Sequence, residues 1–111
     1  MAEPYLRELR SLLERVSPGG AVECKHFFGG AAAYSGGRIF MSWSAVGLAL
    51  KLPAETRIRL FQDGATALRY FPKGPVKKEY AVLPDALTRN DAALAPLIGE
   101  SADYSRKLSG G

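Results

Sequence analysis

The two residue types best suited to nucleophilic or metal chemistry each occur once in this chain, as Cys24 and His26. On a strand, side chains two positions apart point to the same side, which would allow both residues to bind one metal ion. Zinc, however, takes four protein ligands, or three with a water molecule. The chain has no other cysteine or histidine to complete such a set. We therefore expect no metal site.

The same pair is a candidate for nucleophilic catalysis. A cysteine nucleophile needs a base within hydrogen-bond reach, whereas Cβ atoms two positions apart on a strand are about 6–7 Å apart. The carboxylates are scattered over expected turns and helix ends, without the pairing typical of acid–base catalysis. We expect no catalytic residues and no enzyme. A small enzyme or ligand binder near Cys24, His26 and Tyr34 stays an alternative.

Two glycine pairs, Gly29-Gly30 and Gly36-Gly37, are candidates for a phosphate-binding loop. They do not fit the pattern G-x-x-x-x-G-K-[ST], and a strand rather than a helix is expected after each pair. We therefore predict no nucleotide cofactor. Glycine pairs of this kind are typical of tight turns and close backbone contacts. The pattern predicts a strand–turn–strand unit whose structural motif is Phe28, Gly29, Gly30, Gly37 and Phe40.

One cluster of basic residues is interleaved with aromatic residues on an expected hairpin. Such a cluster can bind single-stranded nucleic acid through phosphate attraction and base stacking. Alternatively, its lysines lie in solvent and protect an edge strand from pairing with other chains. The net charge of +4 is compatible with both interpretations. The basic residues are Arg69, Lys73, Lys77 and Lys78, and the aromatic ones are Tyr70, Phe71 and Tyr80.

The elements that must position these residues follow from apolar periodicity. Helices are predicted over 4–16, 53–62 and from 91 onward, and strands over 22–28, 31–34, 38–43, 46–52, 67–71 and 76–82. Because short turns join most strands, the fold class is α+β, with an antiparallel sheet of about five strands built from hairpins. Helices at both ends and one mid-chain helix pack on this sheet.

Several details of these elements are also predicted. In the middle helix, Ile58 and Phe61 are expected to face inward, and Gly64 to be its left-handed cap. In the strand before it, Val46 belongs to the core face, and the small residues on the other face admit a close backbone, a helix or a ligand. Pro96 is expected to kink the last helix or to mark its start, and Thr88 or Asn90 to cap it.

Length and composition predict one domain over 1–108 and a flexible tail over 109–111. No apolar run approaches the about 18 residues of a membrane helix, so we expect no membrane contact. The N-terminus lacks the apolar segment of a signal peptide, which predicts a cytoplasmic protein. Since Cys24 is the only cysteine, no internal disulfide is expected.

Taken together, the motifs resemble the N-terminal domain of the TfoX (Sxy) competence-regulator family, over roughly Leu6 to Tyr104. The residues that carry the resemblance are Phe28-Gly29-Gly30, Tyr34, Gly37-Arg38-Ile39-Phe40, Leu48-Ala49-Leu50-Lys51, Arg57, Phe61, Gly64, Tyr70, Tyr80 and Leu83-Pro84. The resemblance implies an α+β fold with an antiparallel sheet, and it supplies no catalytic residues. One departure is Leu97, where relatives commonly have tryptophan.

Larger members of that family carry a second domain and regulate DNA-uptake genes together with a transcription activator. The present chain ends where that second domain would start, so their regulatory activity is not carried over. The leading hypothesis is a non-enzymatic interaction or regulatory module that binds a protein through a sheet edge or face. Nucleic-acid binding by the basic hairpin is the second hypothesis, and a homodimer is also compatible with the sequence.

Overall fold

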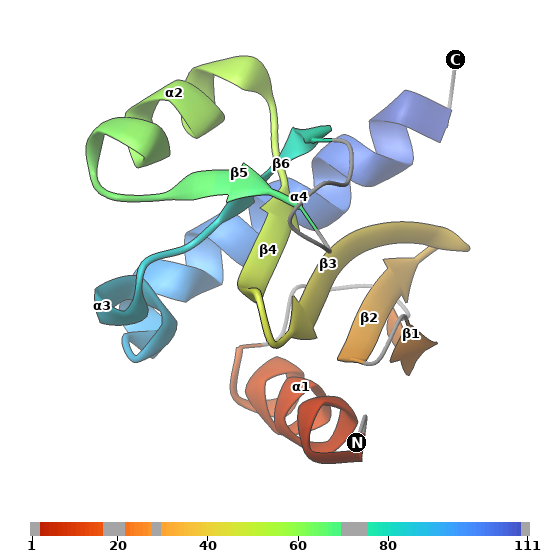
Figure 1. Ribbon diagram of the computed structural model, residues 1–111. Helices are drawn as coiled ribbons and strands as arrows, with labels where there is room; N and C mark the ends of the chain where they lie inside the picture. Colours follow the sequence, from red (N-terminus) through yellow and green to blue (C-terminus); the bar gives the residue numbers. More distant parts are fainter. Residues whose placement is uncertain (1–2, 17–21, 28–29, 70–75, 110–111) are drawn as a thin grey trace.

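The computed structural model describes residues 3–16, 22–27, 30–69 and 76–109 (Figure 1). Within them, helices and strands follow one another in the order expected of an α+β domain. The helices are α1 (Glu3–Arg15), α2 (Ala54–Gln62), α3 (Asp85–Thr88) and α4 (Asp91–Ser109). The strands are β1 (Val22–Phe27), β2 (Gly30–Ser35), β3 (Arg38–Ser44), β4 (Gly47–Lys51), β5 (Thr66–Leu68) and β6 (Lys77–Val82).

The strands form one antiparallel sheet in the order β1-β2-β3-β4-β6-β5. The α+β class and the antiparallel pairing are confirmed, with six strands where about five were expected. Strands β1 to β4 form a simple meander, joined in chain order. β6 then lies between β4 and β5, with Ala49 opposite Val82 on one side and Thr66 opposite Val82 on the other.

The glycines of the predicted strand–turn–strand unit have two different roles. Gly36 and Gly37 form the turn between β2 and β3 with φ of 60° and 79°, values that glycine adopts without strain. Gly30 is required for space instead, because a Cβ there would lie 2.4 Å from the carbonyl oxygen of Trp43. Phe40 is fully buried. Phe28 and Gly29 of the predicted motif lie outside the described residues.

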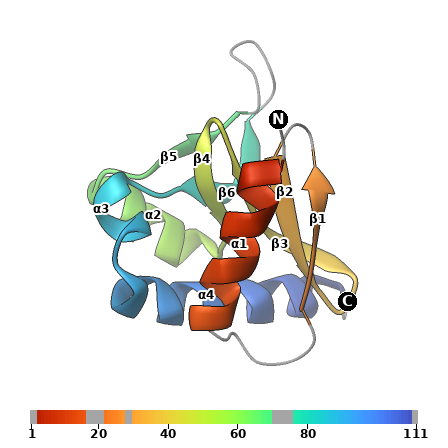
Figure 2. The same cartoon turned by 90° about the horizontal axis from the view of Figure 1, so that it is seen from below.

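Helices α1 and α4 pack on the same face of the sheet and share one hydrophobic core with it (Figure 2). The leucines of α1, which recur at helical spacing, are buried there. Small alanines of β2 allow α1 to approach the sheet closely. The core contains Leu6, Leu9, Leu12, Leu13, Val16, Ala31, Ala33, Phe40, Met41, Leu48, Leu50, Leu52, Leu60, Ala65, Ala81, Leu83, Leu94, Ile98 and Ala102.

A smaller buried cluster lies on the opposite face of β4 and β6, made of Ala49, Leu68, Tyr80 and Val82. At Gly47 a Cβ would lie 2.9 Å from a methyl carbon of Val82. Of the two interpretations of these small residues, close packing within the domain therefore describes Gly47 and Ala49.

Two serines of α4 hold the helix to an irregularity in β3. The register between β2 and β3 shifts between Ala33 and Tyr34, which leaves Phe40 as an extra residue on β3. Ser101 donates a 2.7 Å hydrogen bond from Oγ to the carbonyl oxygen of Phe40. Ser105, about one turn later, donates a 2.8 Å bond to the carbonyl oxygen of Ile39. The bulge thus becomes part of the contact between helix and sheet.

The end of α2 confirms the predicted cap. Gly64 has a φ of 107°. Its amide donates to the carbonyl of Phe61, and the amide of Ala65 donates to the carbonyl of Leu60. This is the hydrogen-bond pattern of a Schellman cap, and the accompanying apolar contact is supplied by Leu60 and Ala65, which are both in the core.

The last helix differs from one prediction and confirms another. Asn90 caps α4, since its side-chain oxygen accepts a 3.2 Å bond from the amide of Ala93. The helix begins at Asp91 and continues through Pro96, so Pro96 does not mark its start. Ser109 is the last residue of α4, whereas Gly110 and Gly111 of the expected tail lie outside the described residues.

Val46 is not part of the core face predicted for the strand over 46–52. It precedes β4, in the turn after β3, and is 39% exposed. The alternation that placed it inside stops where the strand ends, because a turn residue is no longer bound by the pleat. Among the described helices, none is long and apolar enough to cross a membrane.

Candidate functional site

Of the residues of the alternative enzyme or ligand site, Cys24 and His26 share one face of the sheet and Tyr34 lies on the other. Cys24 and His26 lie on edge strand β1, opposite Ala33 and Ala31 of β2. Cys24 is half-buried against the core, while His26 is exposed. Tyr34 is paired with Glu23, so the pleat places it on the other face of the sheet from Cys24. There its ring lies 5.3 Å from the Lys25 ammonium group.

The surroundings of Cys24 favour the protonated thiol over the thiolate. Burial raises its pKa, and the positive charge of Arg10 lowers it by a smaller amount. A raised pKa leaves little thiolate at neutral pH, and the thiolate is the nucleophile. Within the described part of the chain, no group of three or more histidine, cysteine or acidic side chains is placed to hold a metal ion.

The predicted basic residues are only partly within the described chain. Arg69 follows β5, and Lys77 and Lys78 lie on β6, all three exposed. Lys73, like Tyr70 and Phe71, lies outside the described residues. Leu68 pairs with Lys77, so Arg69 comes next to the start of β6.

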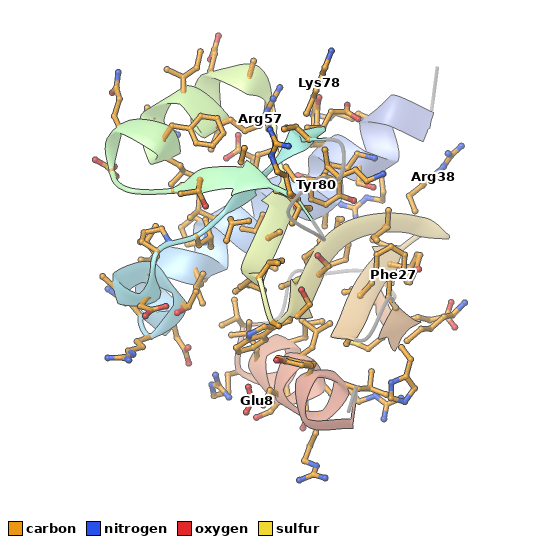
Figure 3. The ribbon with its side chains drawn as sticks, viewed as in Figure 1. Glu8, Phe27, Arg38, Arg57, Lys78 and Tyr80 are labelled. Carbon is orange, nitrogen blue, oxygen red and sulfur yellow. The ribbon has the colours of Figure 1, made fainter. Side chains whose placement is uncertain are left out.

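Arg57 of α2 joins this basic group, which sequence reasoning about the hairpin did not foresee. Its Nε donates a 2.9 Å bond to the carbonyl oxygen of Leu52, and its Nη1 donates to the carbonyl oxygen of Lys78. Figure 3 shows Arg57 and Lys78 close together at one end of the sheet, above Tyr80. A sequence pattern cannot reveal this contact, because it depends on β6 lying next to β4.

Two large apolar side chains of α2 point into solvent. Ile58 is 58% exposed and Phe61 is 40% exposed. Three positions apart, they lie next to each other on one side of the helix. The expectation that they face inward is wrong, because Thr56 and Leu60 form the buried side of α2. The sequence signal for the observed orientation was a second pair at helical spacing, Thr56 and Leu60, whose first member is polar.

Polar contacts on both sides of α2 explain this orientation. Thr56 donates a 2.7 Å hydrogen bond from Oγ1 to Oε2 of Glu100 in α4. Arg57 is held toward β6 by the two carbonyl contacts described above. Since each helical residue turns by about 100°, fixing Thr56 inward and Arg57 toward β6 leaves Ile58 pointing outward.

We call the resulting area the α2 surface: Arg57, Ile58, Phe61, Lys77 and Lys78. The apolar pair forms its centre, and Arg57 lies toward β6. Lys77 and Lys78 follow on that strand, both exposed, with side chains on opposite faces of the sheet. Arg57, Lys77 and Lys78 form no salt bridge with any described residue. The acidic residue of β6, Glu79, is engaged by other side chains. Its Oε1 lies 4.0 Å from Nζ of Lys51, and its Oε2 accepts a 3.3 Å hydrogen bond from the hydroxyl of Tyr104.

A shallow pocket of about 280 Å³ lies elsewhere, between α1 and β3, and is lined by Glu8, Ser11, Arg15 and Trp43. Figure 3 shows Glu8 on α1, far from Arg57 and Lys78. The polar groups of the pocket are largely engaged, because Arg15 binds Asp91 at 2.8 Å and Ser11 at 2.9 Å. The bond to Asp91 attaches α1 to the start of α4.

The fold and this surface define a class of protein: a small α+β domain with helices on one face of an antiparallel sheet and an exposed apolar and basic surface on α2. The TfoX N-terminal domain family matches the chain over residues 14–104 of 111. The chain therefore belongs to the TfoX N-terminal domain family, as the sequence resemblance predicted. No curated protein matches the chain.

Proposed function

We propose that this domain is a non-enzymatic interaction module that binds another protein through the α2 surface. The observation that carries the proposal is the exposure of Ile58 and Phe61, side by side on a short helix. Fully burying a large apolar side chain contributes about 1.5–3 kcal/mol relative to leaving it exposed. A partner that covered both side chains would gain that stabilisation. Membership of the TfoX N-terminal domain family supports an interaction or regulatory module in general terms.

The polar contacts that orient α2 also support this function. Thr56 and Arg57 fix α2 from both sides, so the apolar pair is held in one orientation before a partner arrives. Binding to a preformed surface avoids much of the entropy cost of ordering it. By contrast, Cys24 has a raised pKa and lies on the opposite face from Tyr34, which gives an enzyme site there little support.

Site-specific photo-crosslinking in cells that produce the full chain tests the proposal. A photoreactive amino acid is placed at Ile58 or Phe61, and at the exposed Glu14 of α1 as control. We expect a discrete crosslinked protein from positions 58 and 61 that is absent from position 14. Adding Phe61→Lys to the Ile58 probe should remove it. Equal crosslinking from all three positions, or none from α2, would contradict the proposal.

Nucleic-acid binding through the basic residues is a second candidate, favoured by the exposure of Lys77 and Lys78 beside Arg57. It predicts salt-dependent binding of a labelled single-stranded oligonucleotide, because phosphate contacts release counterions. Replacing Lys73, Lys77 and Lys78 by glutamate should abolish that binding, while Ile58→Lys should not weaken it. The response to Ile58→Lys thus separates the two functions.

A further inference from the structure

The partner of the α2 surface can be specified further, on the basis of the proposed function. We propose that the segment that covers Ile58 and Phe61 is an acidic amphipathic helix. The argument rests on the shape of the apolar centre, on the uncompensated charges beside it, and on the poor fit of a second copy.

The shape favours a helix. Two apolar side chains one turn apart form a ridge along α2, and a ridge of this kind packs into the groove between the side chains of a second helix. An amphipathic helix presents apolar anchors at i, i+3, i+4 and i+7, which match such a ridge in spacing. A nucleic acid would gain little from Ile58, which has neither charge nor an aromatic ring.

The charges favour an acidic partner. On a helical projection Phe61 lies between the outward direction of Ile58 and the β6 direction of Arg57. The apolar centre therefore borders on Arg57, whose Nη1 donates to the backbone carbonyl of Lys78, and neither Arg57 nor Lys78 forms a salt bridge with a described residue. By the same projection Glu55 lies beside Ile58 on the flank away from Arg57, and Glu79 is engaged by Lys51 and Tyr104. Carboxylates on one flank of the partner helix would therefore lie on the side of Arg57, whose charge has no acidic partner among the described residues.

A second copy of this chain fits less well. An antiparallel two-fold pairing of α2 with itself would place the basic side of one copy against the basic side of the other. The net charge of +4 adds a general repulsion between copies. An acidic amphipathic helix would pack on the same apolar centre, and its carboxylates would neutralise the positive charge on the basic side of the α2 surface.

Peptide selection on the purified full chain tests this inference. Random peptides of about 16 residues, some four helical turns, are displayed on phage, selected on the wild-type chain and counter-selected on Ile58→Lys/Phe61→Lys. Both positions are exposed, so this variant is expected to fold, which circular dichroism verifies. We expect the selected peptides to be rich in aspartate and glutamate, with apolar residues at helical spacing.

Fluorescence anisotropy with one selected peptide then measures the role of charge. Lys77→Glu/Lys78→Glu should weaken binding by at least about tenfold, because each substitution replaces an attraction to the carboxylates of the peptide by a repulsion. The matched control Arg7→Glu/Lys107→Glu changes the net charge equally on other elements and should have less than about a twofold effect. Exchanging every glutamate of the peptide for glutamine should also weaken binding about tenfold.

The outcomes separate this inference from the proposed function. Selected peptides that are neutral or basic, or no peptide at all, overturn the acidic helix, while photo-crosslinks at positions 58 and 61 still support protein binding. A wild-type dimer in sedimentation that Ile58→Lys/Phe61→Lys dissociates identifies a second copy and overturns the inference. Oligonucleotide binding that needs Lys77 and Lys78 but not Ile58 overturns it as well. Absence of crosslinks from α2 removes the proposed function, and the inference with it.

Discussion

The hydroxyl of Thr56 donates a 2.7 Å hydrogen bond to the carboxylate of Glu100, and this bond holds Thr56 on the inward side of α2. Thr56 is 3% exposed, so its hydroxyl needs a partner within the protein. A polar residue on the inward side of a helix is thus satisfied, while two apolar residues stay outside. The arrangement costs stability that a core-facing Ile58 would have provided, and it leaves an apolar area for binding.

Replacing Thr56 by valine should lower the free energy of unfolding by about 1–2 kcal/mol, because the isosteric methyl group removes a hydrogen bond to a carboxylate. Urea denaturation measures the difference. Thr56→Ser keeps the donor and should lose less. A Thr56→Val protein as stable as Thr56→Ser would show that the bond contributes nothing net.

Two glycine-to-alanine substitutions should have opposite effects. A Cβ at Gly30 would meet the Trp43 carbonyl oxygen at 2.4 Å, so Gly30→Ala should destabilise by more than about 2 kcal/mol. At Gly99, inside α4, a Cβ meets nothing within 4 Å, so Gly99→Ala should stabilise by about 0.5–1 kcal/mol through helix propensity. Thermal unfolding followed by circular dichroism compares them, and equal midpoints would contradict both assignments.

Ser101→Ala should destabilise by about 1–3 kcal/mol, since it leaves the carbonyl oxygen of Phe40 without its buried donor. Ser105→Ala removes the neighbouring bond to Ile39 in the same way. Chemical denaturation of both single variants and the double variant forms a cycle. Because the two bonds hold one bulge, we expect the double variant to lose less than the sum. Full additivity would mean that the bonds act independently.

The thiol of Cys24 should react slowly. Its raised pKa predicts alkylation by iodoacetamide at neutral pH several-fold slower than that of a short cysteine peptide, with a rate that keeps rising above about pH 8.5, the ordinary cysteine pKa. The control is Lys25→Cys in a Cys24→Ser background, one residue away on the exposed side of β1. Equal rates at positions 24 and 25 would contradict the shielding of Cys24.

The same shift has a consequence for stability. Folding favours the protonated thiol, so the Cys24 contribution is fully present below the pKa of the unfolded chain. It is lost as the pH rises from that value through the pKa in the folded protein. Between these two values the stability of the wild type should fall more steeply with pH than that of Cys24→Ser. Parallel curves from urea titrations at several pH values would count against this linkage.

Local signals in the sequence were sufficient for much of the fold. Gly36-Gly37 predicts the turn between β2 and β3, Gly64 the cap of α2, and Asn90 the start of α4. Each acts within a few residues, through backbone freedom or a side-chain cap. The leucines of α1 likewise predict its buried side, because no competing apolar stripe is present on that helix.

Other features depend on partners far apart in the chain. The pairing of β4 with β6 and the contact of Arg57 with Lys78 join residues that no local pattern relates. On α2 the apolar residues suggested the wrong buried side, since the hydrogen bond of Thr56 with Glu100 spans 44 positions. Sequence reasoning missed the α2 surface because the orientation of α2 depends on these distant contacts.

β6 follows β5 in the sequence, yet in the sheet β6 lies between β5 and the other strands. On a ribosome, the meander of β1 to β4 can form as soon as its residues emerge. β5 waits for residues up to Val82, and α2 for residues up to Glu100. Pairings over such sequence separations form more slowly than hairpins. Because Arg57 meets Lys78 only when β6 is in place, the α2 surface is complete only in a chain that has finished folding.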